Sequence, residues 1–237
     1  MNIWKFLLSG GMLGVLISTV LMFIVLHLLS PMLESKRNSS LRDQHTEFVP
    51  RFGGIAMYWG FIGTLMLLWW LPFEKQGLEL WLLPNNRLFG LCFGGLLAWG
   101  IGLYDDIYNL RARWKLFGQT ILALLAIYFG FELQTIQMPY FKAINLGLFS
   151  WPVTILWIVG MMNAINLVDG LDGLASGLTI VALTCLATIC WWQNQNTLLL
   201  LVLVLLGTTL GFWAFNRPPA SIFMGDSGSL FLGYALA

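Results

Sequence analysis

The residues best suited to chemistry lie in a short polar segment that follows a long apolar run. Oxygen-bearing side chains recur there at every third position, as Asn163, Asn166, Asp169 and Asp172. Such a row of amide and carboxylate oxygens offers a hard cation such as Mg²⁺ several ligands. Glycines at 170 and 173 would let the backbone approach a ligand or hold phosphate with its amides. The alternative is a polar helix end with turn glycines, although Asn near the end of an apolar span is costly unless something pairs with it.

Two adjacent carboxylates, Asp105 and Asp106, follow an earlier apolar run. Adjacent carboxylates repel each other, and the pair becomes favourable when it faces a divalent cation or when one member holds a proton. The pair therefore also suggests a magnesium site. An alternative is a helix-end cap that is neutralised by the basic residues just after it, Arg111, Arg113 and Lys115.

A third polar segment, residues 216–229, leads directly into the last apolar run. It contains Arg217, which can contact phosphate, and Asp226 among small residues. A helix N-terminus with small residues is an anion-binding site. The competing interpretation is that Asp226 or Ser227 only caps that helix.

A fourth segment introduces the second apolar run with Arg51, Gly53 and Gly54. Arginine is suited to clamp phosphate, and the two glycines permit a close approach of the ligand. Anchoring of Arg51 on the cytoplasmic side of a membrane is an equally good explanation of that residue.

These polar segments are joined by apolar runs long enough to cross a bilayer. Of the 237 residues, 58% are hydrophobic and 10% are charged, against roughly a quarter charged in a soluble domain. The predicted spans cover residues 6–29, 53–71, 88–104, 116–131, 151–165, 174–192 and 197–215, and an eighth begins at Ser229. Residues 132–150 are either a short hairpin or an ordinary connector. We therefore expect an all-α fold, a single polytopic membrane helix bundle over residues 1–237, with seven full spans and a truncated eighth.

The distribution of charge predicts which side the polar segments face. Loops after odd-numbered spans hold eight Lys and Arg, whereas the amino terminus and the even-numbered loops hold four, so the odd-numbered loops are expected in the cytoplasm. All six aspartates fall on that side. The net charge of +1 excludes a nucleic-acid partner. Carboxylates, amides, glycines and arginines at one membrane face indicate magnesium-bound phosphate chemistry between a water-soluble diphosphate and a lipid-borne acceptor.

Three motifs taken together resemble a known family. The run NAINLVDGLDGLA, with YDDIYN before it and FMGDSGSLFLG after it, is similar to the polyprenyl-phosphate N-acetylhexosamine-1-phosphate transferases. The resemblance runs from about Arg37 to the last residue. The HxxxxPRxGG element that ends at Gly54 is closer to the branch that starts O-antigen, common-antigen or teichoic-acid linkage synthesis, including undecaprenyl-phosphate N-acetylglucosaminyl 1-phosphate transferases, than to the branch that uses UDP-muramoyl pentapeptide.

The resemblance implies an integral enzyme of the bacterial inner membrane with its active site on the cytoplasmic face. Members transfer a sugar 1-phosphate from a UDP-N-acetylhexosamine to undecaprenyl phosphate or a related polyprenyl phosphate and release UMP. The implied cofactor is Mg²⁺, with Mn²⁺ as a substitute, and a homodimer is left open.

The resemblance also implies roles for individual residues. The implied catalytic residues are Asp105, Asp106, Asp169 and Asp172, the implied metal ligands are Asn166 and Asp226, and the implied substrate contacts are Arg51, Gly53, Gly54, Asn163 and Arg217. The paired aspartates match positions for magnesium or acceptor handling, and Asn163, Asp169 and Asp172 match the nucleotide-sugar pocket. We favour metal positioning over base catalysis, because a lipid phosphate is already mostly ionised at neutral pH.

Two features depart from the family pattern and leave alternatives open. Asn109 stands where many relatives have another Asp, and the sequence stops at Ala237, nine residues into the eighth span, where members continue for several more spans. An inactive truncated homologue is therefore one alternative. An ion-coupled membrane transporter is another, although transporters place aspartates near mid-membrane. An Asp-rich prenyltransferase would need two paired clusters, and the sequence has one.

Overall fold

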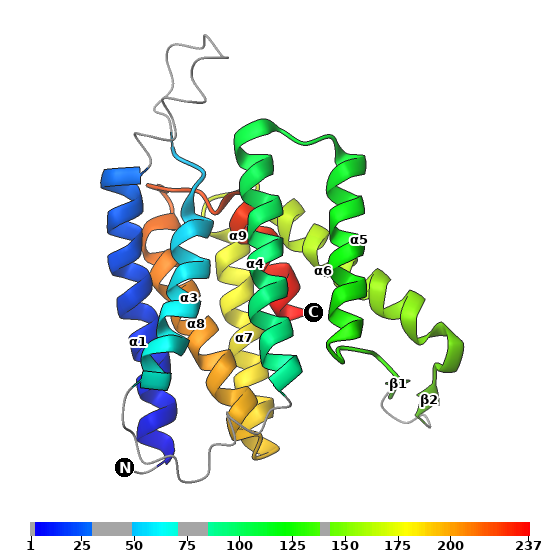
Figure 1. The fold of residues 1–237 in the computed structure, drawn as a ribbon. Helices are drawn as coiled ribbons and strands as arrows, with labels where there is room; N and C mark the ends of the chain where they lie inside the picture. The colour runs from blue at the N-terminus through cyan, green and yellow to red at the C-terminus, as the bar shows by residue number, and fades with distance from the viewer. Residues whose placement is uncertain (1–2, 30–48, 71–84, 138–142) are drawn as a thin grey trace.

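The computed structural model describes residues 3–29, 49–70, 85–137 and 143–237. Its helices are α1 (Ile3–Ile24), α3 (Gly53–Trp70), α4 (Asn85–Tyr108), α5 (Ala112–Tyr128), α6 (Ser150–Val168), α7 (Leu174–Trp192), α8 (Asn196–Asn216) and α9 (Gly225–Leu236) (Figure 1). A π-helical turn, Val25–Leu29, continues α1, and a 3-10 turn, Gly147–Phe149, precedes α6. Strands β1 (Thr135–Ile136) and β2 (Ile144–Asn145) pair antiparallel, so the hairpin interpretation of residues 132–150 is confirmed.

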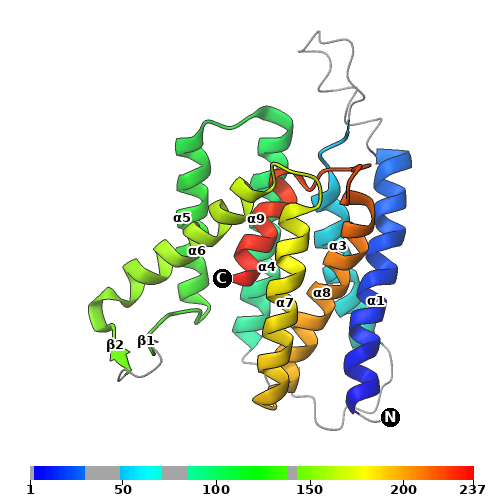
Figure 2. The ribbon, with the colours of Figure 1, turned by 180° about the vertical axis from the view of Figure 1, so that it is seen from behind.

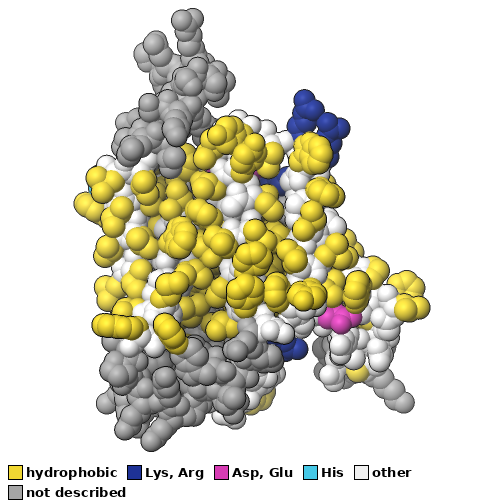
Figure 3. Space-filling model, in the orientation of Figure 1, with side chains coloured by type: hydrophobic (Ala, Val, Ile, Leu, Met, Phe, Trp, Pro, Cys, Tyr) yellow, Lys and Arg dark blue, Asp and Glu magenta, His cyan; other side chains and the backbone are white. Residues whose placement is uncertain are grey.

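The helices form a membrane bundle. Six described segments are long and apolar enough to cross a bilayer, namely Leu7–Leu29, Gly53–Trp70, Asn86–Tyr108, Gly147–Val168, Leu174–Trp192 and Asn196–Asn216. Apolar side chains cover the middle part of the surface in Figure 3, as expected for a surface that contacts lipid instead of water. The all-α membrane fold is therefore confirmed. Because α5 has 17 residues and α9 has 12, the count of seven full spans and a partial eighth stays a prediction.

The boundary of α4 differs from the sequence-based prediction. The third span was expected to end at residue 104, with both aspartates in the following loop, but α4 continues to Tyr108 and carries Asp105 and Asp106 in its last turns. The extension is stable because both carboxyl groups find partners on other elements. Contacts with other parts of the protein, and not only with water, therefore stabilise the carboxyl groups of Asp105 and Asp106 at the end of this span.

Small residues let α1 and α8 pack with their backbones in contact. A Cβ atom added at Gly14 would lie 2.8 Å from the carbonyl oxygen of Val204, and one at Gly207 would lie 2.1 Å from the carbonyl oxygen of Gly11. In the same seam, the Ser18 hydroxyl donates to the Thr208 carbonyl oxygen at 2.9 Å. Close backbone approach and an interhelical hydrogen bond are the usual means by which membrane helices associate.

The short helix α9 lies inside the bundle, in contact with α3, α4 and α6 (Figures 1 and 2). Each of these contacts is made at a glycine. A Cβ atom would lie 2.2 Å from the Asp226 carbonyl oxygen if added at Gly102, 2.2 Å from the Gly228 nitrogen if added at Gly54, and 2.4 Å from Met162 Cα if added at Gly233. The backbone of α9 is therefore held at a fixed depth, with its first residues at one end of the bundle.

The polar segments meet at that same end. The turns after α4, α6 and α8 and the chain entering α3 all lie at the upper end in Figure 1. In Figure 3 a group of Lys and Arg side chains projects there, over the turn between α4 and α5. The bundle thus gathers the loops that the sequence assigned to one membrane face. Some of the charges used in that assignment lie outside the described residues, namely Lys36, Arg37, Arg42, Asp43, Lys75 and Lys142, as does His45 of the fourth motif.

Candidate active site

The centre of the candidate active site is the ammonium group of Lys115, in the first turn of α5. Lys115 Nζ lies 2.9 Å from Asp105 Oδ2 and 3.2 Å from Asn166 Oδ1, and it also forms a short contact with Asp226 Oδ2. The three oxygen-bearing side chains come from α4, α6 and α9. We call these four residues, Lys115 with Asp105, Asn166 and Asp226, the oxygen cluster.

The turn between α4 and α5 brings Lys115 back onto Asp105. Asn109 adopts a φ of 51°, a left-handed conformation that Asn tolerates better than most residues. Its amide donates to the Asp105 carbonyl oxygen at 2.8 Å, and the next amide, of Leu110, donates to Asp105 Oδ1. Asn at this position is thus suited to the turn that builds the cluster.

Asn166 fixes the orientation of the Asp226 carboxylate. Asn166 Nδ2 donates to Asp226 Oδ1 at 2.8 Å and to the Ser229 hydroxyl at 2.9 Å. Burial alone would raise the pKa of Asp226, but hydrogen bonds with Asp105 and Lys115 and the charge of Lys115 outweigh it and lower that pKa. Burial would likewise lower the pKa of Lys115, and the two carboxylates raise it instead. Both groups are therefore held in their charged forms.

Asp106 does not enter the oxygen cluster but caps α9. Its Oδ1 accepts from the Asp226 amide at 2.8 Å and its Oδ2 accepts from the Ser227 amide at 3.0 Å. The sequence left open that Asp226 or Ser227 caps this helix. The N-cap residue of α9 is Met224, which makes no side-chain cap hydrogen bond. A carboxyl group from another helix supplies the cap, and this frees the Asp226 side chain for the cluster.

Gly225, at the start of α9, makes this cap geometrically accessible. It has a φ of 71°, and a Cβ atom there would lie 2.7 Å from Asp106 Oδ2 and 2.4 Å from the Arg51 carbonyl oxygen. Only glycine fits both the left-handed backbone and the crowded surroundings. The glycine that begins the GDSGS motif therefore lets the Asp106 carboxyl group reach the first amides of α9.

The row of four residues at every third position does not form one ligand set. Asn163 donates from Nδ2 to Gln119 Oε1 at 2.6 Å, and Asp172 Oδ2 accepts from the Ala220 amide at 3.0 Å. Only Asn166 reaches the oxygen cluster. Asn163 and Asn166 lie on α6, where residues three apart do not point in the same direction, and Asp172 lies in the turn after α6 ends at Val168.

Asp169, just after the end of α6, lies at the edge of the cluster. Burial raises its pKa to about 7, with additional raising effects from the charges of Asp106 and Asp226. A hydrogen bond from the Gly225 amide and the charge of Arg51 act in the opposite direction. This carboxyl group is therefore poised to change its charge near neutral pH.

The fourth motif packs against the start of α9. Gly53 and Gly54 donate their amides to the carbonyl oxygens of Phe223 and Met224, at 3.0 and 2.9 Å. These amides are already used within the protein, and the crowding at both glycines explains why no larger residue would fit. Arg51 is exposed at this edge, as is Arg217 next to the loop between α6 and α7. The predicted substrate contacts of these four residues stay predictions.

The donor set of the oxygen cluster fits a hard divalent cation. Two carboxylates and one amide oxygen from three helices face a single positive charge, and these are the ligand types that Mg²⁺ prefers. Among the described residues, no three His, Cys, Asp or Glu side chains converge on one point, and the third oxygen of the cluster comes from the amide of Asn166. In this structure the ammonium group of Lys115 contacts all three oxygen-bearing side chains.

Lys115 is the residue that the sequence analysis missed. It was considered as a positive charge of a cytoplasmic loop and as one of three basic residues that neutralise a helix end, and the structure shows its ion pair with Asp105. The exposed Arg111 and Arg113 make no such contact in the described part of the chain. The spacing between Asp105 and Lys115 could have indicated this contact, because a residue in the first turn of α5 can face the last turns of an antiparallel α4.

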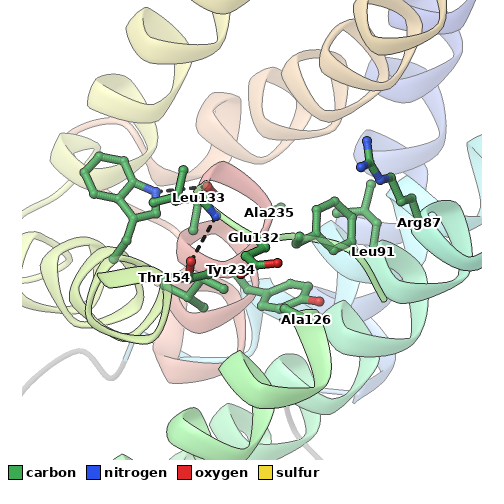
Figure 4. Close-up of a pocket in the computed structure, with 13 residues that line it drawn as sticks. Arg87, Leu91, Ala126, Glu132, Leu133, Thr154, Tyr234 and Ala235 are labelled. Carbon is green, nitrogen blue, oxygen red and sulfur yellow. Dashed lines mark hydrogen bonds between the residues drawn. The ribbon is translucent and has the colours of Figure 1, made fainter. Parts of the chain in front are cut away.

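A separate cavity of about 290 Å³ lies between α4, α5, α6 and α9 (Figure 4). Its wall is mainly apolar, with Arg87 and Glu132 among the lining residues. The amide of Leu133 donates to the Thr154 hydroxyl at 3.0 Å beside it. No member of the oxygen cluster lines this cavity.

Comparison with known proteins identifies a family and named relatives. Residues 88–237 match the sequence model of the family described as Glycosyl transferase family 4. A Bacillus subtilis protein named as a probable undecaprenyl-phosphate N-acetylglucosaminyl 1-phosphate transferase is 36% identical over 199 residues, which cover 84% of this chain and 52% of that protein.

Two further relatives carry the name phospho-N-acetylmuramoyl-pentapeptide-transferase. The protein from Lactobacillus johnsonii is 41% identical over 198 residues, covering 79% of this chain and 60% of the relative. The protein from Listeria welshimeri is 33% identical over 221 residues, covering 85% of this chain and 65% of the relative. The chain thus spans between about half and about two thirds of the length of the curated relatives that it matches.

Proposed function

Since the chain belongs to glycosyl transferase family 4, we propose that it transfers an N-acetylhexosamine 1-phosphate from a UDP-sugar to undecaprenyl phosphate or a related polyprenyl phosphate. UMP is the second product, and the reaction initiates synthesis of a cell-envelope polysaccharide. The name of the Bacillus subtilis relative supports N-acetylglucosamine 1-phosphate as the transferred group. The names of the two muramoyl-pentapeptide relatives support the same type of transfer to a lipid carrier.

The observation that carries this proposal is the oxygen cluster at one end of a membrane bundle. Lys115 and Asp105 are 13% and 12% exposed, so the cluster is shielded but not closed off from solvent. Its members lie near the ends of α4, α5, α6 and α9, where a water-soluble nucleotide and a membrane-embedded lipid can meet. A transporter would instead place such charges near mid-membrane.

The proposed reaction forms one phosphorus–oxygen bond and breaks another. An oxygen of the lipid phosphate attacks the β-phosphorus of the UDP-sugar, and the bond from that phosphorus to the bridging oxygen breaks, so that UMP leaves with that oxygen. Mg²⁺ held by Asp105, Asn166 and Asp226 would neutralise charge on the diphosphate. Asp106 holds the start of α9, and thereby Asp226, in place.

Arg51, Arg217 and Asp169 are assigned to the substrates. Arg51 and Arg217 are exposed at the edge of the same end of the bundle, where their guanidinium groups are available to phosphate. Asp169, on which the charge of Arg51 acts, is assigned to the nucleotide-sugar. By the positive-inside rule this end faces the cytoplasm of a bacterial plasma membrane, where UDP-sugars are available.

The direct test follows a labelled sugar phosphate into lipid. Membranes or detergent micelles containing this chain are incubated with undecaprenyl phosphate, Mg²⁺ and UDP-N-acetylglucosamine that is labelled in the sugar. We expect label in the organic extract, dependent on both Mg²⁺ and the lipid, and at least about a hundredfold less with Asp226→Asn. UDP-N-acetylgalactosamine and the UDP-muramoyl pentapeptide, each labelled in the sugar, are tested as alternative donors in separate reactions.

The matched control is Asp43→Asn, which removes a carboxylate from the sequence between the first two predicted spans, outside the cluster motifs. This variant should transfer like the unchanged chain. Folding is checked by the elution profile and by the melting temperature in detergent. If a folded chain transfers no label from any of the three donors, the proposed function is wrong.

A further inference from the structure

We propose that, without a bound metal, the ammonium group of Lys115 occupies the position that a divalent cation takes in the oxygen cluster. When the cation binds, the Lys115 side chain leaves the cluster and is then free to contact a phosphate. The proposal deepens the proposed function and rests on it, because it requires a divalent cation in the same cluster. It assigns to Lys115 the control of metal affinity.

The first argument is geometric. Lys115 Nζ faces three oxygen atoms from three different helices, Asp105 Oδ2, Asn166 Oδ1 and Asp226 Oδ2. An ammonium group has three protons to donate, so these oxygens satisfy it completely. A cation bound by the same three oxygens would have to occupy the position of Nζ, and the two cannot share it.

The second argument concerns charge. Asp105 and Asp226 carry two negative charges at most, and Lys115 already neutralises one of them. A divalent cation next to an ammonium group would meet a like charge within a few ångströms in a half-buried site, where such repulsion is strong. Departure of Lys115 removes that repulsion and leaves both carboxylates to the metal.

The third argument concerns where Lys115 can go. It lies in the first turn of α5, directly after an exposed turn that carries Arg111 and Arg113. Its side chain has four rotatable methylene bonds, so the ammonium group can leave the cluster without movement of the helix. A phosphate held by the bound metal lies within reach of such a side chain, and lysine serves well as a point charge toward phosphate.

The test measures Mn²⁺ binding to the purified chain by the loss of the spin-resonance signal of free Mn²⁺, without substrates. Lys115→Gln should bind Mn²⁺ at least about tenfold more tightly than the unchanged chain, because a like charge next to the metal has been removed. Arg113→Gln is the matched control. It removes one positive charge two residues away, outside the oxygen cluster, and should change the affinity less than about threefold.

A second measurement needs no substitution. An amine-acylating reagent labels the unchanged chain with and without Mg²⁺, and the extent of labelling of Lys115 is read by mass spectrometry against the other lysines of the chain. Mg²⁺ should raise the labelling of Lys115 severalfold, because its ammonium group leaves the cluster. Unchanged or reduced labelling on adding Mg²⁺ would overturn the proposal even if the Lys115→Gln chain does not fold.

The outcomes separate this inference from the proposed function. Mn²⁺ binding that Asp226→Asn abolishes but Lys115→Gln leaves unchanged or weakens would refute the role of Lys115 and leave the metal site intact. Absence of Mn²⁺ binding in every variant, together with transfer activity, would refute the metal part of the proposed function and this inference with it. Tighter binding in Lys115→Gln alone supports both.

Discussion

The cap that Asp106 places on α9 can be tested by a substitution of a single atom. Asp106→Asn replaces one carboxyl oxygen with an NH₂ group, which cannot accept from a backbone amide. One of the two hydrogen bonds from Asp226 and Ser227 is therefore lost in a buried position. An unsatisfied buried amide costs about 1–3 kcal/mol, and the loss of charge at a helix N-terminus adds to this.

A cost of about 2 kcal/mol lowers the melting temperature of a chain of this size by roughly 4–8 °C. The measurement is thermal unfolding in detergent, with Asp105→Asn as the matched control. That variant loses the charge facing Lys115 but leaves the α9 amides capped, so it reports the separate cost of breaking the ion pair. A melting temperature of Asp106→Asn equal to that of the unchanged chain would refute the assignment of Asp106 as the cap.

Two further predictions concern packing and pH. Gly102→Ala should destabilise the chain and lower its activity, because the new Cβ atom would lie 2.2 Å from the Asp226 carbonyl oxygen, whereas Gly100→Ala, with no atom within 4 Å, should be neutral or slightly stabilising. Thermal unfolding of the two variants checks this, and similar destabilisation would contradict it. Because the pKa of Asp169 is raised to about 7, the folded state disfavours its ionised form. The chain should therefore lose stability as the pH rises from 5 to 8, relative to Asp169→Asn, and parallel melting curves over this range would contradict the shift.

The convergence of the polar clusters at one end of the bundle was predictable because polar residues in an apolar chain have few places to lie. Clusters that follow alternate spans must share one membrane face, and the structure brings Asp105, Asn166 and Asp226 together at that end. The family and the helical fold were predictable for similar reasons, from motif order and from the lengths of the apolar runs.

The contacts that each residue makes inside the site were not predictable. Asp105 and Asp106 are adjacent in sequence, but successive residues on a helix point about 100° apart, so one faces Lys115 and the other faces the amides of α9. Similarly, the three-residue spacing of Asn163 and Asn166 did not indicate that the first would pair with Gln119. These assignments depend on the rotation of each helix about its axis, and tertiary packing sets that rotation.

The central claim, transfer of a sugar 1-phosphate with UMP as product, is tested most directly by isotope exchange. Labelled UMP is incubated with unlabelled UDP-N-acetylglucosamine, undecaprenyl phosphate, Mg²⁺ and this chain, and label is followed into the UDP-sugar. We predict exchange that requires both the lipid and Mg²⁺ and is lost in Asp226→Asn. Absence of exchange with a folded, membrane-inserted chain, or exchange that persists in Asp226→Asn, would contradict the assignment of the oxygen cluster as the catalytic centre.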